Sequence, residues 1–283
     1  MKSKHKKLKG KSLLCWAGAY VFAIAAVVVG ILPFVFMVLN SFKTKFEMLT
    51  KGVFSPPAAL NFKNYRGVLE GGFVRYFGNS TFVLLLSLAL ILLVAACAAY
   101  PLARFRFRLN GLIYGLIVAC MAIPIHITLI PVFQMTKRAG IYDSLLALIG
   151  PDVAFAIPIS VFILTNFMKG IPVEIEESAE IDGCSKYRMF FQIILPLAKP
   201  GISTLAIYNG VNIWNEFSFS YTLTQSVENR TLPLAVWDFQ GQYAMNTPMI
   251  MAVLTLTVLP MILLFLFAQD KLIKGMTSGA VKG

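Results

Sequence analysis

Long stretches without charged side chains alternate with short polar segments along the whole sequence. Asp, Glu, Lys and Arg are absent from 12–42, 76–103, 109–136 and 239–269, while 144–168 and 200–226 each hold one acid. Each stretch can supply the roughly 20 residues that cross a hydrocarbon core of about 30 Å as a helix. The alternation of short strands expected for a membrane β-barrel is absent. We therefore predict an all-α polytopic membrane protein with six transmembrane helices, at about 15–39, 81–103, 111–133, 145–167, 201–222 and 247–268.

The composition supports a membrane protein. Of the 283 residues, 58% are hydrophobic and only 13% are charged, whereas soluble domains are about 45–50% apolar and about 25% charged. This balance excludes a soluble enzyme, a disordered tail and a disulfide scaffold. The cysteines show no Cys-x-x-Cys spacing, and three of the four lie in apolar runs, so we expect buried reduced thiols at Cys15, Cys97, Cys120 and Cys184.

The basic residues predict the orientation in the membrane. The net charge is +12, and 16 of the 25 Lys and Arg residues fall on the side that holds both termini. Basic residues in short loops mark the cytoplasmic side, so we expect both termini there. Their position between apolar runs also argues against nucleic acid as the partner. The basic arm 1–12 suits anionic lipid, and the apolar stretch after it is too long for a cleaved signal peptide.

One polar segment, 170–201, contains residues that are typical of the starts and ends of two short helices. Pro172 suits the first helical position, Gly183 suits a helix end with positive φ, and Ser185 suits the N-cap of a second helix that ends at Pro196. Five carboxylates lie within 174–182, and a solvated acidic face is the simplest interpretation of these alone. The second helix offers apolar anchors, some of which must pack on the membrane helices: Tyr187, Met189, Phe190 and Phe191.

The spacing within this segment resembles the EAA loop of ATP-binding-cassette (ABC) importer permeases. That pattern is Glu-Ala-Ala, three residues, Gly, nine residues, then Ile-x-Leu-Pro. Six of its seven fixed positions are matched, by Glu177, Ala179, Gly183, Ile193, Leu195 and Pro196, with Ser178 in place of the first Ala. Six further motifs resemble the carbohydrate-uptake subfamily of these permeases. They are NSTFV at 79–83, AYPLARFRF at 99–107, IPIHITLIPVF at 123–133, WNEF at 214–217, TLPLAV at 231–236 and SGAVKG at 278–283.

The resemblance implies the type I ABC importer permease fold and three parts: a basic arm 1–12, a permease domain 13–272 that includes the coupling loop 170–200, and a cytoplasmic tail 273–283. It further implies a second homologous permease subunit, two cytoplasmic ATPase subunits that bind ATP and Mg, and an external solute-binding protein, all at a bacterial cytoplasmic membrane. This chain has no Gly-x-x-x-x-Gly-Lys-[Ser/Thr] phosphate loop, so we expect no catalytic residue, metal or cofactor here.

Two groups of residues follow from the resemblance as expected contacts with the ATPases. The coupling loop would use Glu177, Ser178, Ala179, Asp182, Gly183, Ile193, Leu195 and Pro196. The tail would use Ser278, Gly279, Ala280, Val281, Lys282 and Gly283. The substrate class implied is a sugar or an oligosaccharide, and a glycerol-3-phosphate-type permease is an alternative.

Polar residues inside the apolar stretches are candidates for the transport pathway. Glu216, with Asn215, either lines the pathway or is an interfacial carboxylate bonded to helix ends, beside a Trp214 in the aromatic belt. His126 either donates to a carbonyl that neighbouring prolines free, or lines a cavity, or titrates in proton coupling. For Asp152 we expect a cap of a helix that restarts after the Gly-Pro pair preceding it.

Two other classes of protein compete with an ABC permease. A secondary transporter driven by an ion gradient would explain six spans and buried ionisable groups, but it would not explain the structured acidic loop, and no inverted repeat is visible. A membrane-bound enzyme or signalling subunit would need convergent catalytic groups, and the chain has only two histidines and no metal-ligand spacing.

Overall fold

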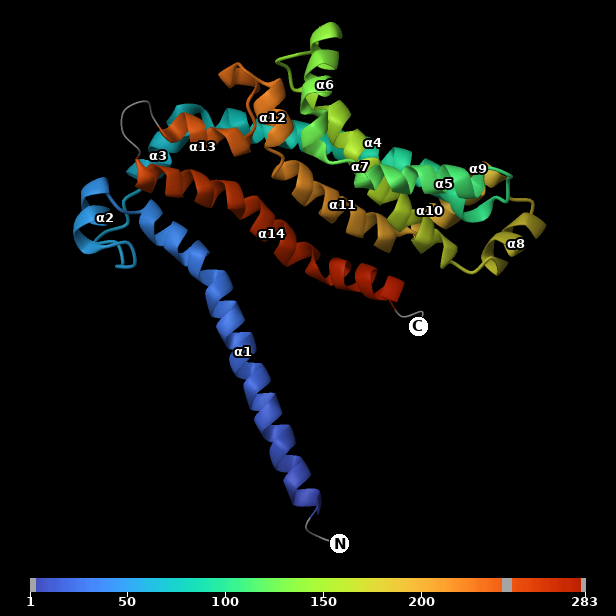
Figure 1. The fold of residues 1–283 in the computed structure, drawn as a ribbon, viewed down its shortest axis with the longest axis horizontal. Coiled ribbons are helices and arrows are strands. Elements are labelled where there is room, and N and C mark those ends of the chain that lie inside the picture. The colour runs from blue at the N-terminus through green and yellow to red at the C-terminus, as the bar shows by residue number, and fades with distance from the viewer. Residues whose placement is uncertain (1–3, 241–245, 281–283) are drawn as a thin grey trace. The chain divides into compact units, whose positions relative to one another are not determined.

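The computed structural model describes residues 4–240 and 246–280, and the side chains of 15–237, 239 and 246–267. Within these ranges the chain is helical and contains no β-strand (Figure 1). The helices are α1 (Lys4–Ser41), α2 (Lys45–Lys51), α3 (Lys63–Val68), α4 (Val74–Arg104), α5 (Asn110–Ala119), α6 (Ile125–Arg138), α7 (Leu146–Lys169), α8 (Glu174–Ile181), α9 (Lys186–Met189), α10 (Leu195–Leu197), α11 (Lys199–Trp214), α12 (Ser218–Leu223), α13 (Leu232–Gln240) and α14 (Thr247–Ala280).

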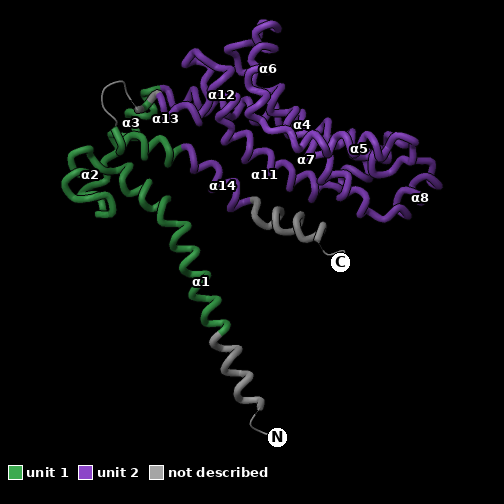
Figure 2. Tube along the Cα trace, in the orientation of Figure 1, with its two compact units in different colours: residues 1–71, 239–256 green, residues 72–238, 257–283 purple. Residues whose placement is uncertain are grey.

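The chain forms two compact units (Figure 2). The first holds residues 1–71 and 239–256, and the second holds 72–238 and 257–283. In the first unit a fully buried lysine organises the chain after α1. The Lys43 ammonium donates to Asn40 Oδ1 at 3.1 Å and to the Gly52 carbonyl at 3.0 Å. Because a buried charge is costly without such partners, these bonds fold the segment back on the end of α1.

The second unit is built on three helices. α7 packs along α4, and α11 packs against both (Figure 1). Small side chains lie at the contact, including the fully buried Ala95 and Ala99 of α4, and they let helix backbones approach closely. A buried hydrogen bond of 2.9 Å from Asn209 Nδ2 to Ser160 Oγ joins α11 to α7. This three-helix core positions the sites described below.

Four helical segments are long and apolar enough to cross a membrane, and the number rises to six if each of two bent helix pairs counts as one span. The four are Cys15–Ser41, Lys63–Arg104, Leu146–Lys169 and Thr247–Phe267. They cover the first, second, fourth and sixth predicted spans. The first and last helices of the chain are longer than predicted, since α1 begins at Lys4 and α14 continues to Ala280. No membrane-length segment was missed within the part of the chain that the structure describes.

The prediction of an unbroken third span is wrong. The stretch divides into Asn110–Ala122 and Ile125–Arg138, and the two parts meet at 98°. Ile123 has φ −78° and ψ 115°, because a residue that precedes proline is pushed out of the helical region. The helix then restarts after Pro124, which occupies the N-cap position.

The fifth span also differs from the prediction. α11 begins at Lys199, ends at Trp214 and is bent by 69° from the preceding 186–197 helix, so the expected continuous helix over 201–222 is interrupted. α12 resumes only at Ser218. In contrast, α7 runs unbroken through Pro151, so the predicted restart there is wrong and Asp152 lies inside a helix rather than at its cap. Membrane helices tolerate such prolines where neighbouring groups pack around them.

The four cysteines are free, as predicted, but the prediction that they are buried is wrong. Cys15, Cys97 and Cys120 are exposed and Cys184 is half-buried. Exposed apolar side chains are common in this chain. On α1, for example, every residue from 15 to 35 is exposed although most of them are apolar. An apolar surface of this extent faces lipid or a partner rather than water.

Asp143 ties together two turns of the second unit. Its Oδ1 accepts hydrogen bonds from the amides of Gln225 at 2.8 Å and Ser226 at 2.9 Å, and its own carbonyl accepts one from Asn229 Nδ2 at 2.6 Å. The backbone is held at φ 58°, a conformation that Asp tolerates better than most residues. Burial raises the pKa of the Asp143 carboxyl, but the hydrogen bonds from Ser226, Gln225 and Asn229 outweigh it and lower the pKa below its usual value.

We predict that low pH weakens the hydrogen bonds from the Gln225 and Ser226 amides to the Asp143 carboxylate. Because the folded-state pKa of Asp143 is depressed, its stabilising contribution is complete above the unfolded pKa of about 3.9 and is lost as the pH falls through the folded value. Hydrogen exchange of the Gln225 and Ser226 amides should accelerate in the Asp143→Ala variant at pH 7. In the wild type it should accelerate relative to the rest of the chain only in acid. Equal protection in wild type and variant would contradict the prediction, and Glu228→Gln serves as an exposed control.

Candidate functional site

The turn between α8 and α9 has the geometry that the glycine spacing predicted. Gly183 has φ 79° and donates its amide to the Glu180 carbonyl at 3.0 Å, while the Cys184 amide donates to Ala179 at 2.9 Å. This pair of bonds is a Schellman motif, which closes a helix with a left-handed residue that is usually glycine. Gly183 therefore meets a backbone requirement, since a Cβ there would find open space but an unfavourable φ.

The second half of the segment is close to the prediction. The Ser185 hydroxyl caps α9 by accepting from the Arg188 amide at 3.4 Å. A π-helical turn, Phe190–Ile194, joins α9 to α10, so the helix ends at Leu197, one residue after the predicted Pro196. Pro172, in contrast, lies two residues before α8 and does not occupy its first position. We call residues 174–197 the two-helix block.

The two-helix block is anchored to the three-helix core by its apolar residues. Ala179, Met189, Phe190 and Ile194 are buried in one cluster with side chains of α4, α7 and α11, and Ile193 and Leu195 pack at its edge. These contacts divide the predicted coupling residues into two groups. Ala179, Ile193 and Leu195 face the core, whereas the following are exposed: Glu177, Ser178, Asp182, Gly183 and Pro196.

The outer surface of the block carries large apolar side chains that the core does not use. Ile181 is 87% exposed, Tyr187 is 82% exposed and Phe191 is 55% exposed. Of the four anchors expected in the second helix, Met189 and Phe190 thus pack inward while Tyr187 and Phe191 remain outside. Exposed aromatic and aliphatic side chains next to the acids of α8 are typical of a surface that binds another protein.

A buried ion pair joins α8 to the end of α4. Arg104 pairs with Glu176 through Nε and Oε1, and both side chains are less than a tenth exposed. The Tyr100 hydroxyl donates to Glu176 Oε2 at 3.3 Å, and Arg104 Nη2 donates to the Ile171 carbonyl at 2.8 Å. The sequence reasoning missed this pair. The spacing of Glu176 three residues before Ala179 puts both on one helix face, but no local signal points to Arg104 as the partner.

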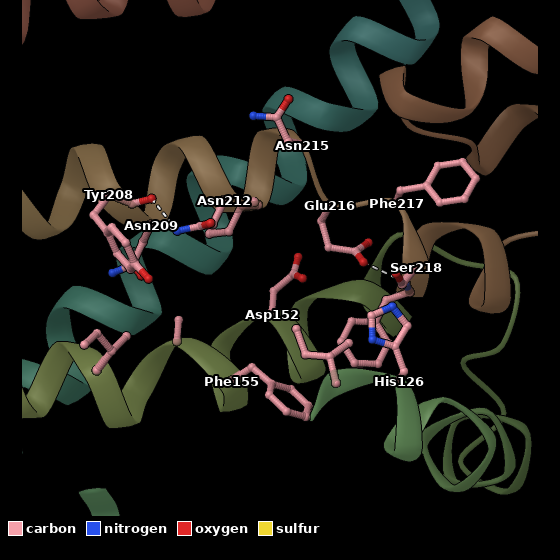
Figure 3. A pocket seen from close by; sticks show the side chains of 15 residues that line it. His126, Asp152, Phe155, Tyr208, Asn209, Asn212, Asn215, Glu216, Phe217 and Ser218 are labelled. Atoms are coloured by element: carbon pink, nitrogen blue, oxygen red, sulfur yellow. Dashed lines mark hydrogen bonds between the residues drawn. The ribbon is translucent and has the colours of Figure 1, made fainter. Parts of the chain in front are cut away.

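A second feature is an open cavity of about 380 Å³ beside α7 and α11. It is lined by the start of α6, by α7, by α11 and by the 215–219 segment. Asp152 is 8% exposed and directs its carboxylate into this space, opposite Glu216 (Figure 3). The described residues contain no group of three or more His, Cys, Asp and Glu side chains placed to hold a metal ion.

Glu216 has a structural role in addition to lining the cavity. Its Oε1 accepts from the Phe219 amide at 2.7 Å and its Oε2 from the Ser220 amide at 2.9 Å. These bonds satisfy the first turn of α12, so the alternative of a carboxylate bonded to a helix end is confirmed. Trp214 is buried and donates to the Thr257 carbonyl at 3.3 Å, so the aromatic-belt prediction for it is wrong.

The other two pathway candidates also line the cavity. His126 faces it from the start of α6 (Figure 3). Within the described ranges its ring has no hydrogen-bond partner, so the predicted bond to a freed carbonyl is not formed and cavity lining is the alternative that fits. Asn215 donates to the Val211 carbonyl at 2.8 Å, and its amide points away from Asp152 (Figure 3). Asp152 itself was not among the predicted pathway residues.

We predict that the Arg104–Glu176 pair sets the stability of the attachment between α4 and α8. Arg104→Met leaves the Glu176 carboxylate buried without a cation, and Glu176→Leu does the reverse. Each single change should destabilise the purified protein by about 3–5 kcal/mol. The double variant Arg104→Met/Glu176→Leu should recover much of the loss, because neither charge is then stranded. A thermal-unfolding double-mutant cycle measures this coupling, and strictly additive effects would contradict it.

Comparison with known proteins agrees with this geometry. Residues 91–278 match the family described as binding-protein-dependent transport system inner membrane component. A putative ABC transporter permease of Caldicellulosiruptor sp. is 48% identical over 264 residues, which cover 93% of this chain and 96% of that protein. The melibiose/raffinose/stachyose import permease of Bacillus subtilis is 34% identical over 254 residues, 89% of this chain and 91% of that one.

The fold agrees as well. A bacterial ABC transporter involved in the import of the acidic polysaccharide alginate aligns with a TM-score of 0.80 at 19% identity, over 92% of this chain and 97% of that one. The predicted type I importer fold is thereby confirmed. The chain belongs to the binding-protein-dependent transport system inner membrane components, the permease subunits of ABC importers.

Proposed function

We propose that this permease forms half of the translocation pathway of an ATP-driven importer for a sugar or an oligosaccharide. The two-helix block carries the proposal, because it presents unused apolar and acidic side chains on a rigid support. The substrate class is supported by the 34% identical relative, which is named for melibiose, raffinose and stachyose import. The chain would act without catalytic residues of its own, and ATP and Mg would bind to the partner ATPases.

The proposed assembly contains four kinds of protein. This chain pairs with a second homologous permease in a lipid bilayer, two cytoplasmic ATPases bind the two-helix blocks, and an external solute-binding protein delivers the sugar. The membrane is the bacterial cytoplasmic membrane, with both termini in the cytoplasm. In the tail, Ser278, Gly279 and Ala280 belong to the last turn of α14. Val281, Lys282 and Gly283 lie outside the described residues, and their contact with the ATPases stays a prediction.

Coupling in this proposal is mechanical. The block shares one buried cluster with α4, α7 and α11, so a force applied to its outer surface moves these helices together. Closure of the ATPases would then shift the permease pair between inward-facing and outward-facing states. Glu177 and Asp182, both exposed, supply negative charge for basic groups of the ATPase.

We predict that Gly183→Pro uncouples transport from ATP hydrolysis while the protein still inserts in the membrane. Proline fixes φ near −65° and removes the amide that bonds to Glu180. Gly140→Pro is the matched control, because Gly140 also has positive φ, 69°, and open space around its Cβ position. Sugar uptake per ATP hydrolysed should fall in the Gly183 variant alone. Glu177→Lys should weaken ATPase co-purification, and Glu177→Gln should do so less.

Two results would contradict the prediction that the two-helix block couples transport to ATP hydrolysis. If Gly183→Pro and Glu177→Lys both transport sugar at the wild-type rate and retain the ATPase, the two-helix block does not couple the subunits. If Gly140→Pro loses uptake equally, the effect reports general damage from proline at a left-handed residue.

Topology gives an independent prediction. In a variant whose native cysteines are replaced, Tyr187→Cys should react with a membrane-permeant maleimide only, because the block is expected in the cytoplasm. Glu228→Cys, in the exposed turn between α12 and α13, should also react with an impermeant maleimide added to intact spheroplasts. The reverse labelling would place the block outside and would refute the orientation inferred from the basic residues.

A further inference from the structure

The cavity beside α7 holds a carboxylate that the protein itself leaves without a donor. Asp152 is 8% exposed and directs its carboxylate into the cavity (Figure 3). Among residues 4–240 and 246–280, no side chain or backbone amide donates a hydrogen bond to it. A carboxylate with little exposure is stabilised when it accepts hydrogen bonds. The Asp152 oxygens are open to donors that enter the cavity from outside the described chain.

The rest of the lining defines which donors fit. Glu216 faces Asp152 (Figure 3), and both of its oxygens accept from α12 amides, so a second acidic side chain belongs to the lining. Tyr208 and Asn212 contribute polar groups that carry no charge, and the ring of Phe155 forms an apolar wall. No lysine or arginine is among the described residues that line the cavity.

We propose that this cavity is a binding site for one glycosyl unit of an uncharged sugar, whose hydroxyl groups donate to the Asp152 carboxylate. The inference rests on the proposed function and narrows its substrate class. The volume, about 380 Å³, lies within the roughly 300–1,000 Å³ range of small-molecule sites. Hydroxyl groups are the donors that a neutral sugar offers in number, and the apolar wall of Phe155 can cover its carbon face.

The same charges select against anionic substrates. A sugar phosphate or a uronic acid would meet two acidic side chains with no lysine or arginine in the lining to compensate, and like charges repel. This counts against the glycerol-3-phosphate alternative. A bound metal ion fits less well than a sugar, because both Glu216 oxygens already accept from amides and no metal-holding group of side chains is found in the described ranges.

The experiment uses the reconstituted importer with its partner permease, ATPases and binding protein. Wild-type uptake is first measured with maltotriose, raffinose and arabinotriose as neutral probes and with trigalacturonate as the anionic probe. With the neutral sugar that is transported best, Asp152→Asn should raise the KM for uptake about tenfold or more, as expected for weakened hydrogen bonds to a charged group. Glu70→Gln, an exposed carboxylate outside the cavity, should leave the KM unchanged.

A second measurement tests occupancy directly. Ala156 lines the cavity, so Ala156→Cys in a background without native cysteines reports access to it. During turnover the transported neutral sugar should slow maleimide labelling of this position, and trigalacturonate at the same concentration should not. In the presence of Asp152→Asn the protection should disappear. This readout remains informative even if Asp152→Asn by itself assembles poorly, because labelling in the single Ala156→Cys variant does not depend on it.

Three results would overturn the inference. Sugar transport without protection of the Ala156→Cys position, and with an unchanged KM in Asp152→Asn, removes the sugar from this cavity while the proposed function stands. Protection by calcium or sodium instead of sugar makes the cavity a cation site. Failure of every neutral probe, together with uptake of the anionic one, refutes both the cavity assignment and the neutral substrate class.

Discussion

Backbone groups at a helix end need hydrogen-bond partners, and where the end lies among apolar side chains water does not supply them. The first amides and last carbonyls of a helix are unpaired, and in a membrane protein water is not at hand to bind them. At three places in the described chain charged side chains meet this need. Lys43 binds carbonyls after α1, Glu216 caps α12, and Arg104 binds the Ile171 carbonyl before α8.

This constraint explains which ionisable groups are free for function. For Glu216 the sequence allowed a pathway residue or a carboxylate bonded to helix ends, and the structure shows both of its oxygens bonded to amides while it also lines the cavity. Asp152 looked like a cap because it follows a Gly-Pro pair, yet α7 continues past it and leaves its carboxylate in the cavity. Only Asp152 therefore departs from the role that its local sequence suggests. The difference lies in where each helix is broken, which depends on packing among α7, α11 and α12.

Much of the fold followed from the sequence because its signals are local. Apolar stretches located the membrane helices, and Gly183 and Ser185 predicted the turn and cap between α8 and α9, since left-handed φ and N-capping depend on neighbouring residues only. The 98° bend before Pro124 and the break after Trp214 were missed, because hydropathy measures composition and not helix direction. The Arg104–Glu176 pair joins residues 72 positions apart, so no local pattern contains it.

The buried pair also explains the rotation of α8, and with it the surface offered to a partner. Hydrophobicity alone would turn Ile181 inward and Glu176 outward, but the structure has the opposite arrangement. A buried ion pair is a weak source of net stability, because desolvation offsets its attraction, but its geometry is directional. The pair forms with Glu176 and Ala179 both facing the core, where Ala179 joins the apolar cluster. That rotation leaves Ile181 and Glu177 exposed, so the ion pair at the end of α4 and the apolar contact of Ala179 together set which side chains the two-helix block presents at its surface.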